Sequence, residues 1–205
     1  MGNSHRKKVQ ARNKKQLWLL AGGNGAGKST FYKTRLKPLG MAFINADVLA
    51  KQLFPNETEE RSYEAAKIAE SLRLELLTEG RSFCFETVFS HPSKIDFIAK
   101  AKAMGYETIL VFVHLENAAL NQARVSQRVS EGGHHVPAKK VINRIPKVMQ
   151  NIKQALPLFD FSYVLDNSRL DNPFHQVAVI KNGQICFITN PIPAWTSALL
   201  SDYLK

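Results

Sequence analysis

Short apolar runs alternate with longer, partly polar segments along most of this chain. The apolar runs cover residues 16–21, 41–45, 82–86, 108–114 and 162–165. Runs of this length, bounded by glycine or polar residues, are typical of buried strands. The segments between them predict helices at residues 27–36, 58–79, 93–104, 117–130 and 138–154. The alternation predicts an α/β domain: a doubly wound, mainly parallel five-stranded sheet with helices on both faces.

The strongest helical pattern covers residues 58–79. Its apolar residues recur at three- and four-residue spacing, so they share one face, and Gly80 follows as a C-terminal stop. In the next helix, Ser93 is placed to cap the N-terminus and Gly105 to end the last turn.

The pattern changes after the fifth apolar run. Residues 177–180 and 184–188 are apolar and flank Lys181-Asn182-Gly183. Asn-Gly between two apolar runs is a strong hairpin signal. A C-terminal β-hairpin over about residues 176–189 is therefore expected at one edge of the sheet.

Length and composition limit the class of protein. The chain has 205 residues, of which 44% are hydrophobic, so residues 16–205 are expected to form one domain with a packed core. No run approaches the ~20 apolar residues that span a bilayer, and the N-terminus has no apolar signal core. We therefore expect a cytoplasmic protein that does not enter a membrane. Cys84 and Cys186 lie in apolar runs and are expected to pack as small hydrophobes rather than to form a disulfide or bind a metal.

The formal net charge is +11, and residues 1–15 contain six basic residues and no acid. We interpret this segment as a basic, flexible tail. Such a tail can bind RNA, DNA or an acidic partner. The simpler reading, a solvated and frayed terminus, is favoured. The rest of the positive charge suits a domain that handles polyphosphates.

One motif carries specific chemistry. Residues 22–29 match the phosphate-loop pattern G-x-x-x-x-G-K-[ST] at every fixed position, between an expected strand and an expected helix. Backbone N–H groups of such a loop wrap polyphosphate, and the following helix adds its positive N-terminus. The expected ATP-binding residues are Gly22, Gly23, Asn24, Gly25, Ala26, Gly27, Lys28, Ser29 and Thr30.

Two side chains of the loop have their own roles. Lys28 is expected to reach the β and γ phosphates, and the Ser29 hydroxyl is expected to bind Mg²⁺. The loop by itself does not separate a kinase from a regulatory NTPase or a motor.

Three carboxylates follow expected strands, at the edge of the sheet where ligands bind in open α/β folds. Asp47 is the candidate base that accepts a proton from the acceptor hydroxyl, because the second strand is expected beside the phosphate loop. Its alternative role is a helix cap. Glu86 is expected to hold Mg²⁺ through water or to bind substrate, or else to form a cap or loop hydrogen bond, while neighbouring Thr87 and Ser90 can donate to a substrate. Asp166 reads as a turn former.

Residues 117–154 are interpreted as a basic, helical lid. Arg124 and Arg128 are four residues apart on one helix face, and Arg144 follows on the next helix, beyond a glycine-rich break at residues 131–137. Arginines on a closing lid exclude water and stabilise a transferring phosphoryl group. The alternative is a pair of surface helices with solvated arginines. His134 and His135 in the break are expected to be exposed or to form a hydrogen bond, not to bind a metal.

These segments together resemble the zeta-toxin family of P-loop kinases, in particular its compact branch. The resemblance covers residues 16 to about 168 and rests on GGNGAGKSTFY, FINAD, FETVFS, RVSEGGHHVP, the following Arg144, and LDNS.

The resemblance implies a soluble bacterial kinase that uses ATP by default rather than GTP. Several family members phosphorylate a hydroxyl of UDP-N-acetylglucosamine and so act as toxins, and some pair with a small antitoxin protein that occludes the nucleotide site. By the same resemblance, Asp47 is the base, and Lys28, Arg128 and Arg144 stabilise the transferred phosphoryl group. Glu86 and Thr87 help to hold the substrate.

The chain departs from the family pattern in the second lid helix. Pro146 is expected to break or kink it, and Lys147 stands where another arginine is expected. Arg124 is therefore a substitute candidate for contact with phosphate or substrate. The compact branch also lacks the extra length that builds the sugar-nucleotide cleft, so the acceptor stays open.

Three functions follow from these observations. A kinase of a small hydroxyl compound, such as a UDP-sugar, is favoured because of Asp47 and the lid arginines. A nucleic-acid kinase is the alternative suggested by the basic tail, although the aromatic residues fall mostly at core-like positions rather than on a stacking platform. A regulatory NTPase without an acceptor would not need the Asp47 base.

Overall fold

A computed structural model of the chain describes residues 14–131 and 136–204. Nearly all of the expected basic tail, together with His134 and His135, lies outside the described residues. Within the described part, no helix combines the length and the apolar character needed to cross a membrane.

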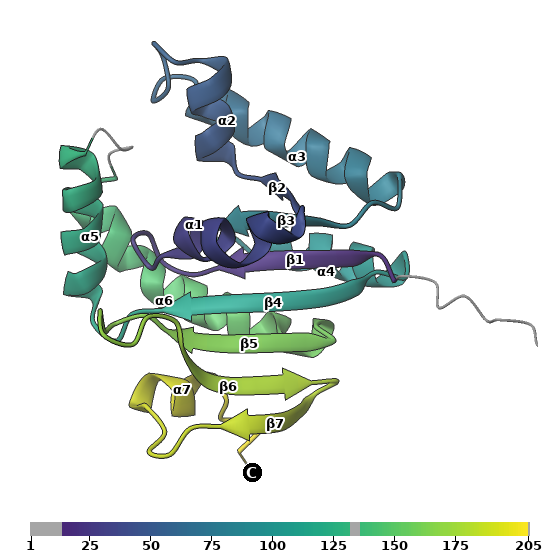
Figure 1. The fold of residues 1–205 in the computed structure, drawn as a ribbon, viewed down its shortest axis with the longest axis vertical. Coiled ribbons are helices and arrows are strands. Elements are labelled where there is room, and N and C mark those ends of the chain that lie inside the picture. The colour runs from purple at the N-terminus through teal and green to yellow at the C-terminus, as the bar shows by residue number, and fades with distance from the viewer. Residues whose placement is uncertain (1–13, 132–135, 205) are drawn as a thin grey trace, which may run out of the picture.

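The described chain forms a seven-stranded sheet in the order β2-β3-β1-β4-β5-β6-β7 (Figure 1). Its first five strands are parallel, and the last two pair antiparallel. This arrangement confirms the parallel core and the hairpin at its edge. The strands are β1 (Gln16–Ala21), β2 (Ala42–Ile44), β3 (Phe83–Thr87), β4 (Glu107–His114), β5 (Phe161–Asp166), β6 (His175–Lys181) and β7 (Gln184–Ile188).

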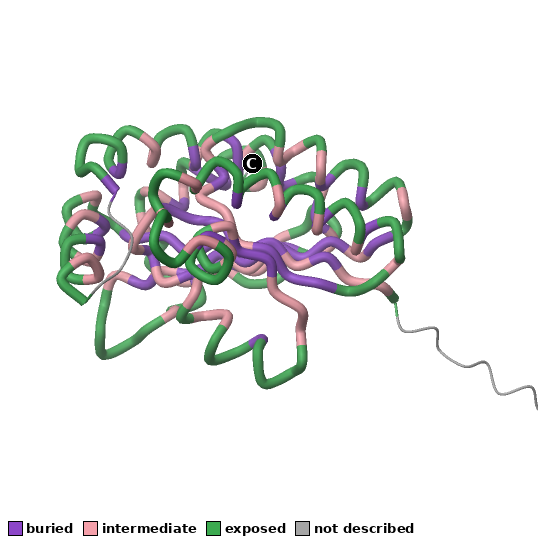
Figure 2. Tube along the Cα trace, turned by 90° about the horizontal axis from the view of Figure 1, so that it is seen from above, coloured by how far each residue is buried: buried purple, intermediate pink, exposed green. Residues whose placement is uncertain are grey.

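Helices cover both faces of the sheet, as expected, but unequally. Most of the helices that pack against the sheet lie on one face, and the helical segment after the phosphate loop covers the other. Figure 2 shows the buried strands as a layer inside these helices. The helices are α1 (Lys28–Phe31), α2 (Ala46–Leu53), α3 (Ser62–Thr78), α4 (Ser93–Ala103), α5 (Ala118–Ser130), α6 (Ala138–Ala155) and α7 (Ala194–Leu199), and the short η segments are Tyr32–Leu36, Lys37–Leu39 and Leu156–Leu158.

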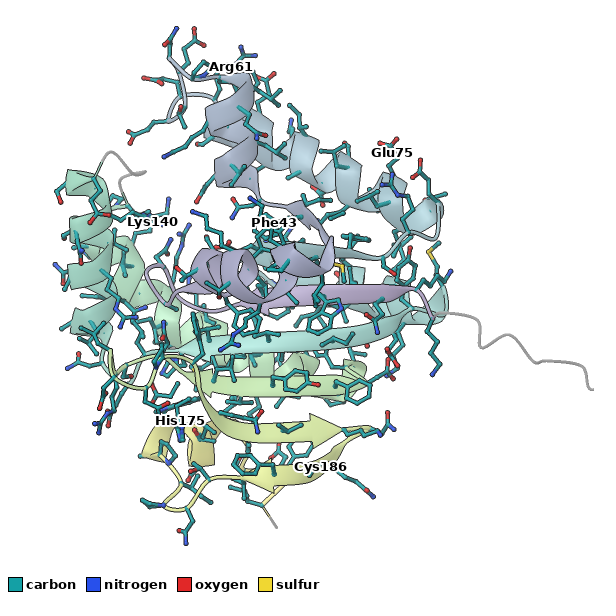
Figure 3. All side chains as sticks on the ribbon, viewed as in Figure 1. Phe43, Arg61, Glu75, Lys140, His175 and Cys186 are labelled. Carbon is teal, nitrogen blue, oxygen red and sulfur yellow. The ribbon has the colours of Figure 1, made fainter. Side chains whose placement is uncertain are left out.

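Alternate strand residues point to opposite faces and fill two cores. In β1, Leu17 and Leu19 pack with the buried residues of α3, α4 and α6, whereas Leu20 packs with those of the segment after the loop. Cys84 is buried in the second core, and its burial raises the pKa of the thiol well above the usual value. Cys186 is exposed on β7 (Figure 3), so the expectation that it packs in the core is wrong: an edge strand leaves one of its faces uncovered.

Three helix predictions need correction. The helix expected at residues 27–36 is α-helical only in α1, and π-helical winding follows over Tyr32–Leu36. There the Thr34 hydroxyl donates to the carbonyl of Thr30, a local contact that competes with helical bonding. Ser93 does not cap α4, because Pro92 holds the cap position and the Ser93 amide donates to His91. The helix expected from residue 58 begins at Ser62.

The second lid helix also differs from its prediction. Helix α6 continues through Pro146, which is exposed, so the expected break is wrong. The ring removes one backbone donor at the solvent side, while Val141, Val148 and Ile152 are buried on the other side and hold the helix together.

Candidate active site

The phosphate loop joins β1 to α1 at the carboxyl-terminal edge of the sheet. Gly22 adopts φ 148°, and a side chain there would meet the backbone carbonyl of Val113 on β4. Gly27 adopts φ 104° at the start of α1, and a Cβ atom at this position would meet the Asn167 amide. Glycine is required at both positions because the backbone conformation and the close neighbours exclude a side chain.

Lys28 is buried beneath the loop, with 5% of its surface exposed. Its Nζ donates to the carbonyls of Gly22 (3.0 Å) and Gly23 (2.9 Å) and lies 3.7 Å from Glu86 Oε1. Burial lowers the pKa of Lys28 and outweighs the opposing charges of Glu86 and Asp47. Two backbone carbonyls and one carboxylate thus hold the Lys28 amine inside the loop, and phosphate oxygens can take their place.

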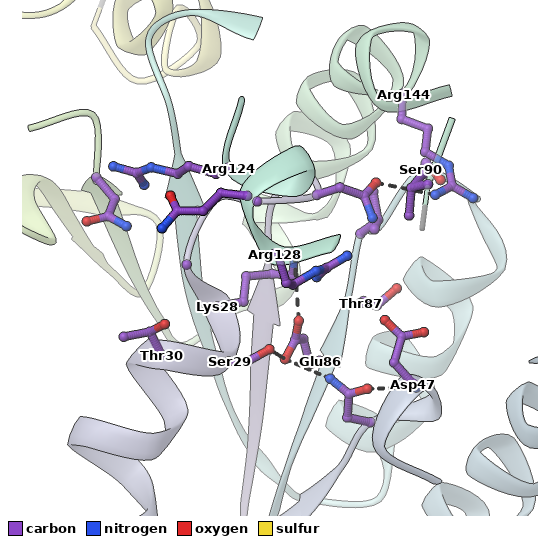
Figure 4. Close-up of a pocket in the computed structure, with 18 of the residues that line it drawn as sticks. Lys28, Ser29, Thr30, Asp47, Glu86, Thr87, Ser90, Arg124, Arg128 and Arg144 are labelled. Carbon is purple, nitrogen blue, oxygen red and sulfur yellow. Dashed lines mark hydrogen bonds and ion pairs between the residues drawn. The ribbon is translucent and has the colours of Figure 1, made fainter. Parts of the chain in front are cut away.

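Glu86 ends β3, which lies directly beside β1, so its carboxylate faces the start of α1. The Ser29 hydroxyl donates to Glu86 Oε2 (2.7 Å), and the Asn45 amide donates to the same oxygen (2.8 Å), as Figure 4 shows. Glu86 thus forms a loop hydrogen bond, as its alternative role expected, and it does so directly beside the phosphate loop.

Ser29 and Glu86 together fit a Mg²⁺ site. A hydroxyl and a carboxylate lie side by side next to the phosphate loop, and Mg²⁺ prefers such oxygen ligands. The described residues contain no group of three or more His, Cys, Asp or Glu side chains that could hold a metal. This suits Mg²⁺, which is usually bound by one or two protein groups together with substrate phosphates.

Asp47 lies in the first turn of α2, and its side chain is exposed toward the same cavity as the loop. Asn45 caps this helix by accepting from the amides of Asp47 (2.8 Å) and Val48 (3.1 Å). The alternative role of Asp47 as the cap is therefore wrong. The reason for choosing Asp47 also needs correction, because β3 separates β2 from β1.

The three arginines of α5 and α6 face the same site. Arg124, Arg128 and Arg144 all line a cavity of about 780 Å³ together with Lys28 and Asp47. Arg144 donates to the side chain of Asn24 in the loop (3.3 Å), and burial lowers its pKa. The two helices thus bring their arginines to the phosphate loop and to the candidate base.

The structure also places Thr87 and Ser90 in this cavity, and Figure 4 shows Thr87 beside Asp47. Asp166 accepts from the amide of Ser168 (2.7 Å) and forms a turn, as expected. The cavity therefore collects the side chains that the sequence selected for catalysis, for substrate and for the metal.

Three asparagines of the site were missed. Asn121 on α5 donates to the carbonyl of Asn24 (2.7 Å), and Asn167 after β5 donates to the carbonyl of Ala26 (2.8 Å). Both tie the loop to distant parts of the chain. Asn45 is the third, and its place two residues before Asp47, at the start of a helix, was the signal that could have identified it.

The family model described as "Zeta toxin" matches residues 3–183, which is most of the chain. The chain belongs to the zeta-toxin family. Membership in this family agrees with the expected class of enzyme, a phosphotransferase with a hydroxyl acceptor.

Two solved structures share the fold. One is the AvrRxo1-ORF1:AvrRxo1-ORF2 complex with sulphate ions (TM-score 0.70, 18% identity, 93% of this chain). The chain spans 63% of the length of the protein that it matches there. The other is the PezAT toxin–antitoxin system of Streptococcus pneumoniae, with a TM-score of 0.64, 19% identity, and coverage of 93% of this chain and 78% of the other.

Two further relatives are less informative about function. An uncharacterized protein of Haemophilus influenzae is 27% identical over 130 residues, which is 60% of this chain and 92% of that protein. A putative kinase of Chloroflexus aurantiacus superposes with a TM-score of 0.60 at 16% identity. The match covers 77% of this chain and 91% of the kinase chain. At these identities the solved structures establish the α/β fold of P-loop kinases for this zeta-toxin family member.

Proposed function

We propose that this zeta-toxin family member is an ATP-dependent kinase that transfers a γ-phosphoryl group to a hydroxyl of a small molecule. One observation carries the proposal: an exposed carboxylate, Asp47, shares a single cavity with the phosphate-loop lysine and three arginines. A switch that only hydrolyses nucleotide needs an oriented water, not a carboxylate that can accept the proton of an acceptor hydroxyl.

Binding and charge stabilisation fall to the basic residues. Residues 22–30 bind the nucleotide phosphates, and Lys28 moves from its carbonyl partners to the β and γ oxygens. Arg128 and Arg144 neutralise charge on the transferring group, and Arg124 contacts phosphate or substrate. Enzymes catalyse phosphoryl transfer almost entirely by positioning the reactants and by stabilising charge in the transition state. A solved AvrRxo1 complex that contains ATP supports ATP as the donor, with GTP the alternative.

Ser29 and Glu86 would hold Mg²⁺, which when bound neutralises charge on the β and γ phosphates. Asp47 orients the acceptor hydroxyl and takes its proton as the oxygen attacks the phosphorus, while the bond to the leaving nucleoside diphosphate breaks. Glu86 and Thr87 bind the acceptor on the Asp47 side of the cavity.

For the acceptor we propose a UDP-activated sugar such as UDP-N-acetylglucosamine, and hence action as a toxin in the cytoplasm. Family membership supports this choice. Because one similar structure pairs AvrRxo1-ORF1 with AvrRxo1-ORF2 and the other belongs to a toxin–antitoxin system, we also propose a small antitoxin as the partner.

The Asp47→Asn variant tests the proposal. The protein is incubated with γ-labelled ATP, Mg²⁺ and a panel of UDP-sugars, nucleosides, NAD and short RNAs. We expect label on a UDP-sugar with the wild type and a loss of transfer of at least about 100-fold in the variant, because a general base contributes about that much. ATP affinity, measured by calorimetry, should stay unchanged.

Two outcomes contradict parts of this proposal. Normal turnover by the Asp47→Asn variant removes Asp47 as the base. Label on RNA instead of a small molecule makes the protein a nucleic-acid kinase, and label released only as free phosphate with every acceptor points to a hydrolase.

A further inference from the structure

Asn45 uses both ends of its side-chain amide in the site. It follows β2, it is 7% exposed, and neither the phosphate-loop motif nor the choice of the base includes it. Its oxygen accepts from two amides in the first turn of α2, those of Asp47 and Val48. Its nitrogen donates to Glu86 Oε2 at 2.8 Å.

These bonds form a continuous connection across the sheet. Ser29 on α1 donates to Glu86 on β3, and Asn45 after β2 donates to the same oxygen. Because β3 lies between β2 and β1, the candidate base on α2 follows an edge strand that does not pair with the strand of the phosphate loop. The Asn45 amide links the two.

We propose that Asn45 is a positioning residue: its amide fixes the Glu86 carboxylate for Mg²⁺ and fixes the start of α2, hence Asp47, relative to that carboxylate. The inference deepens the proposed function and rests on it for the role of Asp47. A residue that only capped α2 would need an oxygen, as serine or aspartate provides, and would not need a donor. The amide nitrogen of Asn45 instead donates to Glu86 Oε2. The other carboxylate oxygen, Glu86 Oε1, lies 3.7 Å from Lys28 Nζ.

The test separates the two ends of the amide. Asn45→Ser keeps an oxygen that caps α2 but removes the amide donor to Glu86. The matched control is Asn117→Ser, because Asn117 caps α5 through its own oxygen (2.8 Å to the Ala119 amide) on an exposed site. For each protein, ATP affinity is measured by calorimetry with Mg²⁺ and again with EDTA. The affinity with Mg²⁺ divided by the affinity with EDTA is the gain from Mg²⁺.

We expect Asn45→Ser to lower the gain from Mg²⁺ by about tenfold or more, as for other groups that orient a metal ligand. The affinity for metal-free ATP and the gain in the Asn117→Ser control should not change. In a Glu86→Gln background, Asn45→Ser should have no further effect on the gain. An unchanged gain in Asn45→Ser, or an equal loss with and without Glu86, overturns the inference.

Thermal unfolding checks that the variants fold. If Asn45→Ser does not fold, Asn45→Thr replaces it, since threonine also caps a helix through an oxygen and has no amide donor. The gain from Mg²⁺ should then fall in Asn45→Thr and stay unchanged in Asn117→Thr, and an unchanged gain in both overturns the inference.

The two proposals fail separately. If no acceptor receives label, the kinase proposal fails, while the metal gain still reports on Asn45 and Glu86. If transfer occurs and the gain does not depend on Asn45, only the positioning role fails.

Discussion

Lys28 shows how one buried side chain can be prepared for a ligand. Its amine lies among two backbone carbonyls and one carboxylate, and 95% of the residue is out of solvent. Burial disfavours the charged form, and Glu86 only partly offsets that cost. An incoming polyphosphate supplies the missing negative charge, so nucleotide binding and the protonation of Lys28 are coupled.

This coupling predicts that ATP affinity falls with rising pH. The pKa of Lys28 is below 10.5, since burial and then Arg128 lower it more than Glu86 and Asp47 raise it. ATP needs the protonated amine, so affinity should weaken as pH rises through the lowered pKa, before an ordinary lysine loses its proton. Titrations across alkaline pH, by calorimetry, measure the effect.

Lys28→Arg is the control, because arginine stays charged throughout. Its affinity for ATP is expected to be lower at neutral pH but independent of pH over the same range. A parallel decline in both proteins would mean that another group causes it.

Gly27 provides a second prediction at this scale. A methyl group there strains the left-handed backbone and displaces the Asn167 amide that holds the loop. Gly27→Ala should lower the free energy of unfolding by the ~1–2 kcal/mol of a left-handed residue plus ~1–3 kcal/mol for the lost hydrogen bond. ATP binding should weaken with it. Urea unfolding and ATP titration measure the two effects.

Gly105 is the matched control, because it has a similar backbone (φ 78°) and no heavy atom within 4 Å of the added methyl group. Gly105→Ala should carry only the backbone cost and leave ATP binding unchanged. Equal losses in the two variants would show that Asn167 does not matter.

At the scale of elements, α5 and α6 are both attached to the tip of the phosphate loop. Asn121 on α5 binds the Asn24 carbonyl, and Arg144 on α6 binds the Asn24 side chain. The arginines of these helices are therefore held near the loop before any nucleotide arrives.

Pro146 lies two residues after Arg144 and weakens the helix that carries it. It has no N–H to donate within α6, and its ring is exposed. Pro146→Ala restores the missing hydrogen bond and should raise the free energy of unfolding by up to about 3 kcal/mol. Urea unfolding of the two proteins measures the difference.

Pro157→Ala is the comparison. Pro157 is also exposed but stands in the first turn of its short helical segment, where no amide donor is needed. No gain is expected there. If Pro146→Ala is not more stable than the wild type, α6 has already relaxed around the proline.

At the scale of the whole molecule, the parallel sheet brings five strand ends to one edge and so creates the cavity. The antiparallel hairpin extends the sheet on the side away from β2, and the segment that leads into β6 adds Pro173 and Phe174 to the lining of the cavity. The candidate catalytic groups in the cavity therefore come from segments that lie far apart in the sequence.

The tail gives a prediction at this scale. Deleting residues 1–13 removes four basic residues and no acid from the formal charge of +11. The sheet starts beyond the deletion, where Lys15 accepts from the Glu107 amide and Gln16 donates to Ser82. Phosphorylation of a small acceptor should be unchanged. For single-stranded RNA, a plot of the logarithm of the binding constant against the logarithm of the salt concentration should become less steep by about 3.

Phosphorylation assays and RNA titrations at several salt concentrations test this separation. Loss of small-molecule phosphorylation after the deletion would make the tail part of the active site. An unchanged salt dependence would assign RNA binding to the folded domain.

Much of the fold and site could be predicted because the signals are local. The apolar runs identified all five parallel strands, and Asn182-Gly183 identified the hairpin. The phosphate loop was evident because a fixed pattern of glycines, lysine and serine meets a backbone requirement within eight residues. The start of α3 at Ser62 and the cap of α4 at Pro92 were not predicted, since hydrogen bonds of neighbouring turns decide them.

The sequence by itself determined the strands, the loop and the types of residue that its chemistry needs, because each depends on neighbours a few positions away. Only the tertiary structure decided that β3 separates β2 from β1, that Cys186 is exposed, and that α6 tolerates Pro146. It also decided that Asn45 joins Asp47 to Glu86. These outcomes depend on strand order and on burial, which contacts between distant segments fix and no local pattern contains.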